Sequence, residues 1–330
     1  MTKFIAEIGG NHGGSLKTAL KTIDAACDAG ADYVKFQSWE ADTMAIPGYI
    51  IKDGPWAGRE LLDLYRETHT PWYWHERLFA HAWDIGIIPF STPFDTASVA
   101  LLEALECPLY KIASLEINDT ELLRCVGRTG KPVILSTGAA SDIEIAAALS
   151  TLRQSIKSVI TDITLLHCVS AYPTRHQDAN LMRMVNMSSN YDGDAVGLSD
   201  HSQGSLVPMA ATALGASIIE KHFILDRNME TPDCAFSLEP AEFKNMVESC
   251  RQVEAMLKPP TSDVEESSRL LKRSLYYARD LRQGHILELG DFITRRPAAG
   301  LDPVCLNTMI GKPLMADVSH NQPAMLSDTP

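Results

Sequence analysis

Two histidines stand just beyond two consecutive apolar runs late in the chain. His201 follows the run 195–198, and His222 follows the run 218–220. If these runs are neighbouring strands, their backbones lie about 4.8 Å apart, so both imidazoles can converge on one divalent cation. Two histidines without thiolates fit manganese, or another octahedral divalent ion such as magnesium or cobalt, better than structural zinc. Carboxylates that could lie nearby are Glu7, Glu116 and Asp233. Two satisfied histidines in a polar cavity are the alternative interpretation.

Two lysines lie inside strand-like runs. Lys35 belongs to the run 33–36 and Lys111 to the run 109–112, where an uncompensated ammonium would be costly. Each is therefore expected to face an anion, and together they suit a phosphate and a carboxylate. A structural ion pair is the alternative for either lysine. Hydroxyl donors around the same anion would come from Thr92, Ser114, Ser136 and Ser199.

These polar residues follow or interrupt short apolar runs that alternate with segments of helical periodicity. The runs are 4–8, 33–36, 87–90, 109–112, 133–135, 163–166, 195–198 and 218–220. Eight strand-and-helix units predict a (β/α)8 TIM barrel of roughly 250 residues. Such a barrel gathers the C-terminal ends of its strands at one mouth, where active sites lie.

The remaining segments predict a loop over that mouth and a second domain. Residues 41–70 are interrupted by prolines and glycines, which indicates a loop with a short helix. Consecutive prolines at 259–260 begin a linker, and the later pattern changes to short β-like pieces and turns. We expect a catalytic barrel over residues 1–257, a linker over 258–272 and a small domain over 273–330.

Composition excludes several classes of partner. The formal net charge of −13 offers no basic field for nucleic acid or an anionic membrane. The apolar stretch 207–219 is too short to span a bilayer, and the N-terminus lacks the apolar region of a signal peptide. The seven cysteines form no Cys-x-x-Cys pair, so neither a disulfide framework nor a thiolate zinc site is expected. These features predict a cytoplasmic protein.

Several motifs in one order resemble the sialic acid synthase family over almost the whole chain. They are Ala6-Glu7-Ile8-Gly9-Gly10-Asn11-His12, Val34-Lys35-Phe36-Gln37, Ser91-Thr92-Pro93-Phe94, Tyr110-Lys111-Ile112-Ala113-Ser114-Leu115-Glu116, Leu135-Ser136-Thr137-Gly138, Gly197-Leu198-Ser199-Asp200-His201 and Ile219-Glu220-Lys221-His222-Phe223. The region from Arg273 to Pro313 resembles the family's antifreeze-like (SAF, β-clip) domain.

The resemblance implies a metal-dependent condensation of phosphoenolpyruvate with an N-acetylated amino sugar, with His201 and His222 as metal ligands. Phosphoenolpyruvate contacts would come from Lys35, Thr92, Lys111, Ser114, Ser136 and Ser199. Residues around the acceptor sugar would be Gln37, Glu116, Tyr172 and Asp233. It also implies a domain-swapped homodimer in which Arg296 reaches the partner's sugar. Glu116 is the first candidate for handling the proton of the attacking water, and Glu7 is the second.

Departures from the common motifs point to one branch of the family. Leu115 stands where glycine is usual, and Ser170 stands where asparagine is usual. With Trp56 they resemble pseudaminic acid synthases, whose acceptor would be 2,4-diacetamido-2,4,6-trideoxy-altropyranose. An apolar side chain at 115 would suit a deoxy methyl group. The alternatives are an N-acetylneuraminate synthase that uses N-acetylmannosamine and a noncatalytic carbohydrate-binding barrel.

Overall fold

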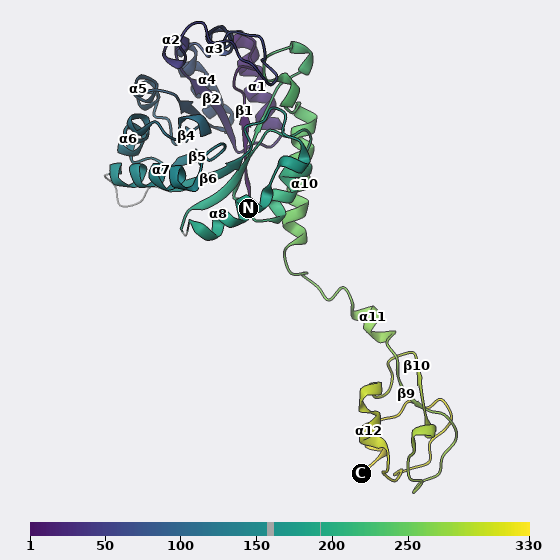
Figure 1. Cartoon of the computed structure of the whole chain (residues 1–330). Helices are drawn as coiled ribbons and strands as arrows, with labels where there is room; N and C mark the ends of the chain where they lie inside the picture. The colour runs from purple at the N-terminus through teal and green to yellow at the C-terminus, as the bar shows by residue number, and fades with distance from the viewer. Residues whose placement is uncertain (157–161, 192) are drawn as a thin grey trace. The chain divides into compact units, whose positions relative to one another are not determined.

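The computed structural model describes residues 1–156, 162–191 and 193–330. The chain divides into two compact units, Met1–Leu257 and Lys258–Pro330 (Figure 1). Each unit has its own cluster of buried apolar side chains.

The first unit is a closed barrel of parallel strands, which confirms the predicted barrel (Figure 1). The strands are β1 (Lys3–Glu7), β2 (Tyr33–Ser38), β3 (Ile88–Pro93), β4 (Tyr110–Ile112), β5 (Val133–Ser136), β6 (Ile163–Cys168), β7 (Ala195–Asp200) and β8 (Ile218–His222). They pair in sequence order, and β1 closes the barrel against β8 with Glu7 opposite His222.

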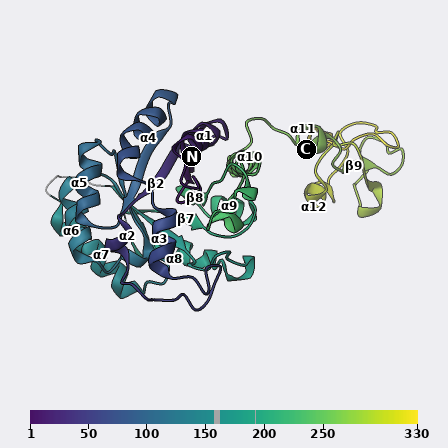
Figure 2. The same ribbon diagram turned by 90° about the horizontal axis from the view of Figure 1, so that it is seen from above.

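Helices surround the strands on the outside of the barrel (Figure 2). They are α1 (Leu16–Asp28), α4 (Trp72–Ile85), α5 (Thr96–Ala104), α6 (Thr120–Thr129), α7 (Asp142–Ser155), α8 (Leu181–Asn190), α9 (Leu206–Ala213) and α10 (Pro240–Met256). Local signals set their ends: Ser141 and Glu144 form a capping box before α7, and Gly86 ends α4 with φ 85°. Across residues 1–156, 162–191 and 193–330, no helix is both long and apolar enough to cross a membrane.

The predicted mouth loop contains two helices rather than a single short one. α2 (Ala41–Met44) and α3 (Leu61–Thr68) frame it, and a single bridge joins Ile50 to Glu60. The ring of Trp39, just after β2, packs on Tyr65 of α3 at 5.8 Å between centroids. This contact returns α3 to the C-terminal end of β2, so the loop stays close to the barrel.

The second unit is built from short β pieces and turns. β9 (Ser274–Tyr277) pairs antiparallel with β10 (Phe292–Arg295), and the helices are α11 (Glu266–Leu270) and α12 (Leu306–Met309). Its core residues are Leu275, Tyr277, Leu281, Leu287, Phe292, Met309, Leu314, Val318 and Ala324. α11 lies inside the segment expected to be a plain linker. Short 3-10 turns in the described parts of both units are η1 (Ser114–Glu116), η2 (His176–Asp178), η3 (Arg227–Met229), η4 (Cys234–Phe236), η5 (Leu289–Asp291), η6 (Pro303–Cys305) and η7 (Leu326–Asp328).

Candidate active site

A buried charge cluster of Glu7, Lys35, Lys111 and Glu220 fills the mouth of the barrel. Lys35 Nζ lies 2.6 Å from Glu7 Oε2 and 3.8 Å from Glu220 Oε1. Lys111 Nζ lies 3.5 Å from the same Glu220 oxygen. All four side chains are at most 6% exposed. Because both lysines approach one carboxylate, the two ammonium groups converge on a shared volume.

Burial and the neighbouring charges shift the pKa values of these four groups in different directions. Burial raises the pKa of Glu7, with a further contribution from the Glu220 charge. Burial acts in the same direction on Glu220, but Lys111 and Lys35 outweigh it and hold the Glu220 pKa below its ordinary value. Burial also lowers the pKa of Lys111, whereas Glu220 and Glu7 keep the pKa of Lys35 raised against burial. An arriving anion would favour the charged form of both lysines.

Predicted hydroxyl donors surround the cluster. The Lys35 ammonium donates to the Thr92 hydroxyl at 3.2 Å, and the Ser199 hydroxyl donates to Glu220 Oε1 at 3.1 Å. Within the described residues, Ser136 Oγ and Glu220 Oε2 are buried without a hydrogen-bond partner. Such atoms are costly unless a ligand or water satisfies them. The mouth therefore holds polar groups prepared for a polar ligand.

Ser114 and Ser170 lie together beside a backbone position that has no room for a side chain. Their hydroxyl oxygens are 3.3 Å apart. A Cβ built on Gly138, just after β5, would lie 2.6 Å from Ser170 Oγ and 2.5 Å from Cys168 Sγ. Glycine at 138 therefore lets these side chains approach the loop after β5. Cys168 is buried and burial raises the pKa of its thiol, so it resembles a core residue more than a nucleophile.

His201 and His222 lie side by side, with ring centroids 5.5 Å apart. His201 Nδ1 is 2.9 Å from the Val169 carbonyl, so that nitrogen donates and Nε2 keeps its lone pair. His222 Nδ1 is buried without a hydrogen-bond partner in the described chain, and Asp233 Oδ2 lies 3.7 Å from it. Burial lowers the pKa of both histidines, that of His222 well below its ordinary value. Neutral imidazoles with free lone pairs fit a divalent cation. In the described residues, no group of three or more His, Cys, Asp or Glu side chains is gathered tightly enough to hold a metal.

Gly9 brings three more predicted residues together. Its φ of 49° is a left-handed conformation, and a Cβ there would lie 3.1 Å from Glu7 Oε1, 3.2 Å from Asp233 Oδ2 and 3.7 Å from Gln37 Nε2. A side chain at position 9 would therefore push into this carboxylate pair. Burial, followed by repulsion from Glu7, raises the pKa of Asp233 to about 7.

Glu116 ends the turn η1 beside the charge cluster. Burial raises its pKa to about 7, while the positive charge of Lys111 acts in the opposite direction. Oε2 of Glu116 is buried without a partner among the residues described. A carboxyl that exchanges its proton near neutral pH is suited to general acid–base chemistry. The neighbouring residue Leu115 is 68% exposed.

An aromatic wall of Trp56, Tyr172 and Phe236 borders the two histidines. Trp56 comes from the mouth loop, and its Nε1–H donates to the Pro232 carbonyl at 3.0 Å. The centroid of its ring lies 5.5 Å from the Tyr172 ring centroid and 6.2 Å from that of Phe236. Tyr172 in turn lies 4.3 Å from the His201 ring, and Phe236 lies 4.9 Å from the His222 ring. The wall gives the imidazole pair one apolar boundary.

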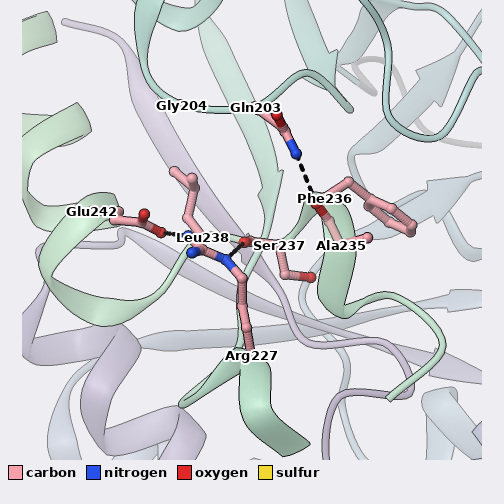
Figure 3. Close-up of a pocket in the computed structure, with 8 residues that line it drawn as sticks. All are labelled: Gln203, Gly204, Arg227, Ala235, Phe236, Ser237, Leu238 and Glu242. Carbon is pink, nitrogen blue, oxygen red and sulfur yellow. Dashed lines mark hydrogen bonds and ion pairs between the residues drawn. The ribbon is translucent and has the colours of Figure 1, made fainter. Parts of the chain in front are cut away.

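A cavity of about 260 Å³ opens beside the Phe236 backbone (Figure 3). It is lined by Gln203, Gly204, Arg227, Ala235, Phe236, Ser237, Leu238 and Glu242. The Arg227 guanidinium pairs with Glu242 and donates to the Ser237 carbonyl at 3.2 Å. The charged residues of this lining are one arginine and one glutamate, so the cavity carries no net formal charge.

Arg296 is the predicted site residue that lies outside the barrel. It is an exposed residue directly after β10 in the second unit.

Three contributors to the mouth had no role assigned from the sequence: Glu220, Trp56 and Phe236. Period-two alternation in the run 218–222 places Glu220 on the same face as His222, which was a usable signal. Trp56 and Phe236 lie in irregular segments, which carry no such periodicity.

Comparison with known proteins identifies one matching family model and several related synthases. The NeuB family model matches residues 22–261. The pseudaminic acid synthase of Helicobacter pylori is 40% identical over 99% of this chain and 97% of its own length, and that of Campylobacter jejuni is 39% identical over 98% and 95%. The solved structure of the N-acetylneuraminic acid (sialic acid) synthetase of Leptospira borgpetersenii, in complex with citrate, is 34% identical. The superposition covers 81% of this chain and 90% of the Leptospira chain, with a TM-score of 0.72.

Proposed function

The chain belongs to the NeuB family of sialic acid synthases, and on that premise we propose that it condenses phosphoenolpyruvate with 2,4-diacetamido-2,4,6-trideoxy-altropyranose and water, giving pseudaminic acid and phosphate. A new bond joins C3 of phosphoenolpyruvate to the aldehyde carbon of the open-chain sugar. Water adds to C2, and the C2 oxygen substituent leaves as phosphate.

The convergence of Lys35 and Lys111 on Glu220 is the observation that carries this proposal. The two ammonium groups lie 3.8 Å and 3.5 Å from one carboxylate oxygen, and all three side chains are at most 6% exposed. In our proposal they hold the phosphate and carboxylate of phosphoenolpyruvate, with hydroxyls as neutral donors. The hydroxyls are Thr92, Ser114, Ser136 and Ser199. Preorganised charges in a dry site stabilise developing charge without reorganisation.

We propose that His201 and His222 hold a divalent metal, with Mn²⁺ as the first choice. This proposal is supported by the lone pair of His201 Nε2 and by the Nδ1 of buried His222, which has no hydrogen-bond partner among the described residues. When bound, the ion would supply Lewis acidity toward the carbonyl oxygen of the acceptor. The protein's own contribution is to keep both imidazoles neutral by burial, which leaves their lone pairs available.

Glu116 is our candidate for accepting the proton of the attacking water. Its pKa of about 7 gives the ionised and protonated forms comparable populations near neutral pH. Glu7 is the second candidate, because its raised pKa lets it hold a proton at a pH where an exposed carboxyl would not. Asp233 and Gln37 lie beside Glu7 around Gly9, so they could orient polar groups of the sugar.

The aromatic wall supports a deoxy acceptor. Tyr172 and Phe236 contact the two histidines, so a sugar whose aldehyde reaches these histidines meets the wall at the same time. The ring faces of this wall can accommodate a methyl group at C6 without leaving a polar group of the sugar unpaired. The relatives at 39–40% identity over nearly the full chain favour the same acceptor over N-acetylmannosamine.

We further propose that the second unit is an antifreeze-like SAF domain that closes the partner's site in a swapped homodimer, with Arg296 on the acceptor. Its short antiparallel β pair, single-residue bridges and separate small core support this assignment. The exposed position of Arg296 after β10 leaves its guanidinium available to a substrate.

The decisive experiment incubates the purified protein with phosphoenolpyruvate, Mn²⁺ and one acceptor at a time, following phosphate release and product mass. The altropyranose acceptor should release phosphate and give the mass of pseudaminic acid. Faster turnover of N-acetylmannosamine would instead favour an N-acetylneuraminate synthase. Sugar binding without phosphate release would favour a noncatalytic barrel.

A further inference from the structure

Asp200 and Lys221 stand in the same two motifs as the histidines but face away from the mouth. Side chains alternate along a strand, so Ser199 and Glu220 share the mouth face and these two residues take the other. Their Cα atoms are direct partners in the β7–β8 register. Lys221 Nζ lies 2.5 Å from Asp200 Oδ2, and the two side chains are 0% and 3% exposed. The proposed chemistry uses neither residue.

This buried pair is tied to the backbone that carries the histidines. Asp200 Oδ1 accepts from the Ser202 N–H at 2.9 Å, and Oδ2 accepts from the Ser202 hydroxyl at 3.0 Å. The Lys221 ammonium also donates to the Ser202 carbonyl. One network therefore holds the residues before and after His201 together with the residue before His222.

Stability alone does not account for such a pair. Apolar residues of similar volume often replace a buried ion pair at no cost in stability, because desolvation of the charges offsets their attraction. What an apolar pair lacks is direction: it does not fix one strand end against the next. The segment after β7 is held from the other side as well, since the Thr174 N–H donates to the His201 carbonyl at 2.9 Å.

We propose that Asp200 and Lys221 are positioning residues that set the spacing of His201 and His222 for a shared divalent cation, an inference that rests on the proposed metal site. The pair acts through the backbone at the two strand ends. It touches neither the cation nor the substrates.

The test replaces both charges by apolar residues of similar size, Asp200→Leu with Lys221→Met. Mn²⁺ affinity is measured from the electron paramagnetic resonance signal of the free ion, and the Co²⁺ absorption spectrum reports ligand geometry. Phosphoenolpyruvate binding and the melting temperature are followed in parallel. We expect an unchanged phosphoenolpyruvate affinity in a folded protein whose melting temperature is lowered, because the buried N–H, hydroxyl and carbonyl of Ser202 lose their partners. The Mn²⁺ affinity should fall roughly 10- to 100-fold, as it does when groups that orient metal ligands are removed, and the Co²⁺ spectrum should change.

A matched control lies at the other end of the same strand. Asp194, directly before β7, pairs with Arg153 at 2.5 Å, and Asp194→Asn should leave Mn²⁺ affinity unchanged. If the double variant does not fold, the near-isosteric Asp200→Asn decides, with an expected loss of Mn²⁺ affinity of roughly 10-fold or more. Parent-like Mn²⁺ affinity in the folded variant would overturn the positioning role. A parent protein that binds no Mn²⁺ refutes the metal site itself, and the positioning role for a cation falls with it.

Discussion

Replacing Lys111 by methionine tests whether the buried charge cluster binds the phosphoenolpyruvate anion. The ammonium lies 3.5 Å from Glu220 Oε1. Two unit charges at that distance attract by ~5 kcal/mol at an effective dielectric constant of about 20, and desolvation offsets much of this. Removing one partner of a buried charged contact costs about 2–5 kcal/mol of binding, so the Kd for phosphoenolpyruvate should rise roughly 30- to 4,000-fold. The acceptor KM should change much less.

A second variant separates binding from folding. Lys111→Met leaves the Glu220 carboxylate with Lys35 at 3.8 Å as its remaining cation, which should destabilise the barrel by about 3 kcal/mol. Adding Glu220→Gln removes the uncompensated charge, so thermal stability should largely return. Affinity for phosphoenolpyruvate should stay low, because the anion still lacks its cation.

Isothermal titration with phosphoenolpyruvate and thermal unfolding supply both readouts. Lys131→Met is the matched control, because Lys131 pairs with Glu103 at 2.6 Å where both side chains are partly exposed. It should change neither quantity by more than about 1 kcal/mol. Recovery of phosphoenolpyruvate affinity together with stability in the double variant would refute the anion role. Equal increases in both substrate KM values would also move Lys111 out of that role.

The same variant has a pH signature. Burial raises the pKa of Glu116 to about 7, and the Lys111 charge lowers it. A base must be ionised to accept a proton, so activity should rise with pH through about 7 in the parent protein. Loss of the Lys111 charge should move this limb to higher pH. An unshifted limb would mean that another group controls it.

The remaining predictions concern the metal site, the base, the aromatic wall and the lid. His201→Ala and His222→Ala should each weaken Mn²⁺ binding at least about tenfold and suppress condensation, and full activity of both in chelator-treated buffer would contradict the metal assignment. Glu116→Gln should remove the rise of activity with pH near 7, which rate–pH profiles check; a profile with that rise intact would point to another buried carboxyl, Asp233 or Glu7. Trp56→Ala should raise the KM of the 6-deoxy acceptor and reduce, by about tenfold, the selectivity of the enzyme for this acceptor over N-acetylmannosamine. Unchanged selectivity would show that Trp56 does not contact the acceptor. Arg296→Ala should mainly impair use of the acceptor while the barrel stays folded. Mixing it with a Lys111→Ala variant should restore activity; if mass-tagged subunits exchange and activity stays absent, the proposed action of Arg296 across the dimer fails.

Local sequence patterns were sufficient to predict the barrel. Short apolar runs between helical segments specify strands and helices through side-chain periodicity, and each strand of the barrel overlaps one of the predicted runs. Buried lysines within such runs signalled a polar interior, because a charge in a strand needs a partner. The mouth loop was predicted less well: its second helix, Leu61–Thr68, packs against Trp39 through contacts that the local pattern does not contain.

The tertiary structure decided which distant segments of the chain contact each other. Closure of the barrel places Glu7 opposite His222, a relation that no local periodicity carries. Trp56 reaches Tyr172 and Phe236 from an irregular loop, so its place depends on packing rather than on propensity. Residue types and their alternation determined by themselves which side chains can share the barrel interior. Which of those side chains come within hydrogen-bonding or ionic distance was decided only when strand register and barrel closure fixed their separations, because those separations depend on pairings between residues far apart in the chain.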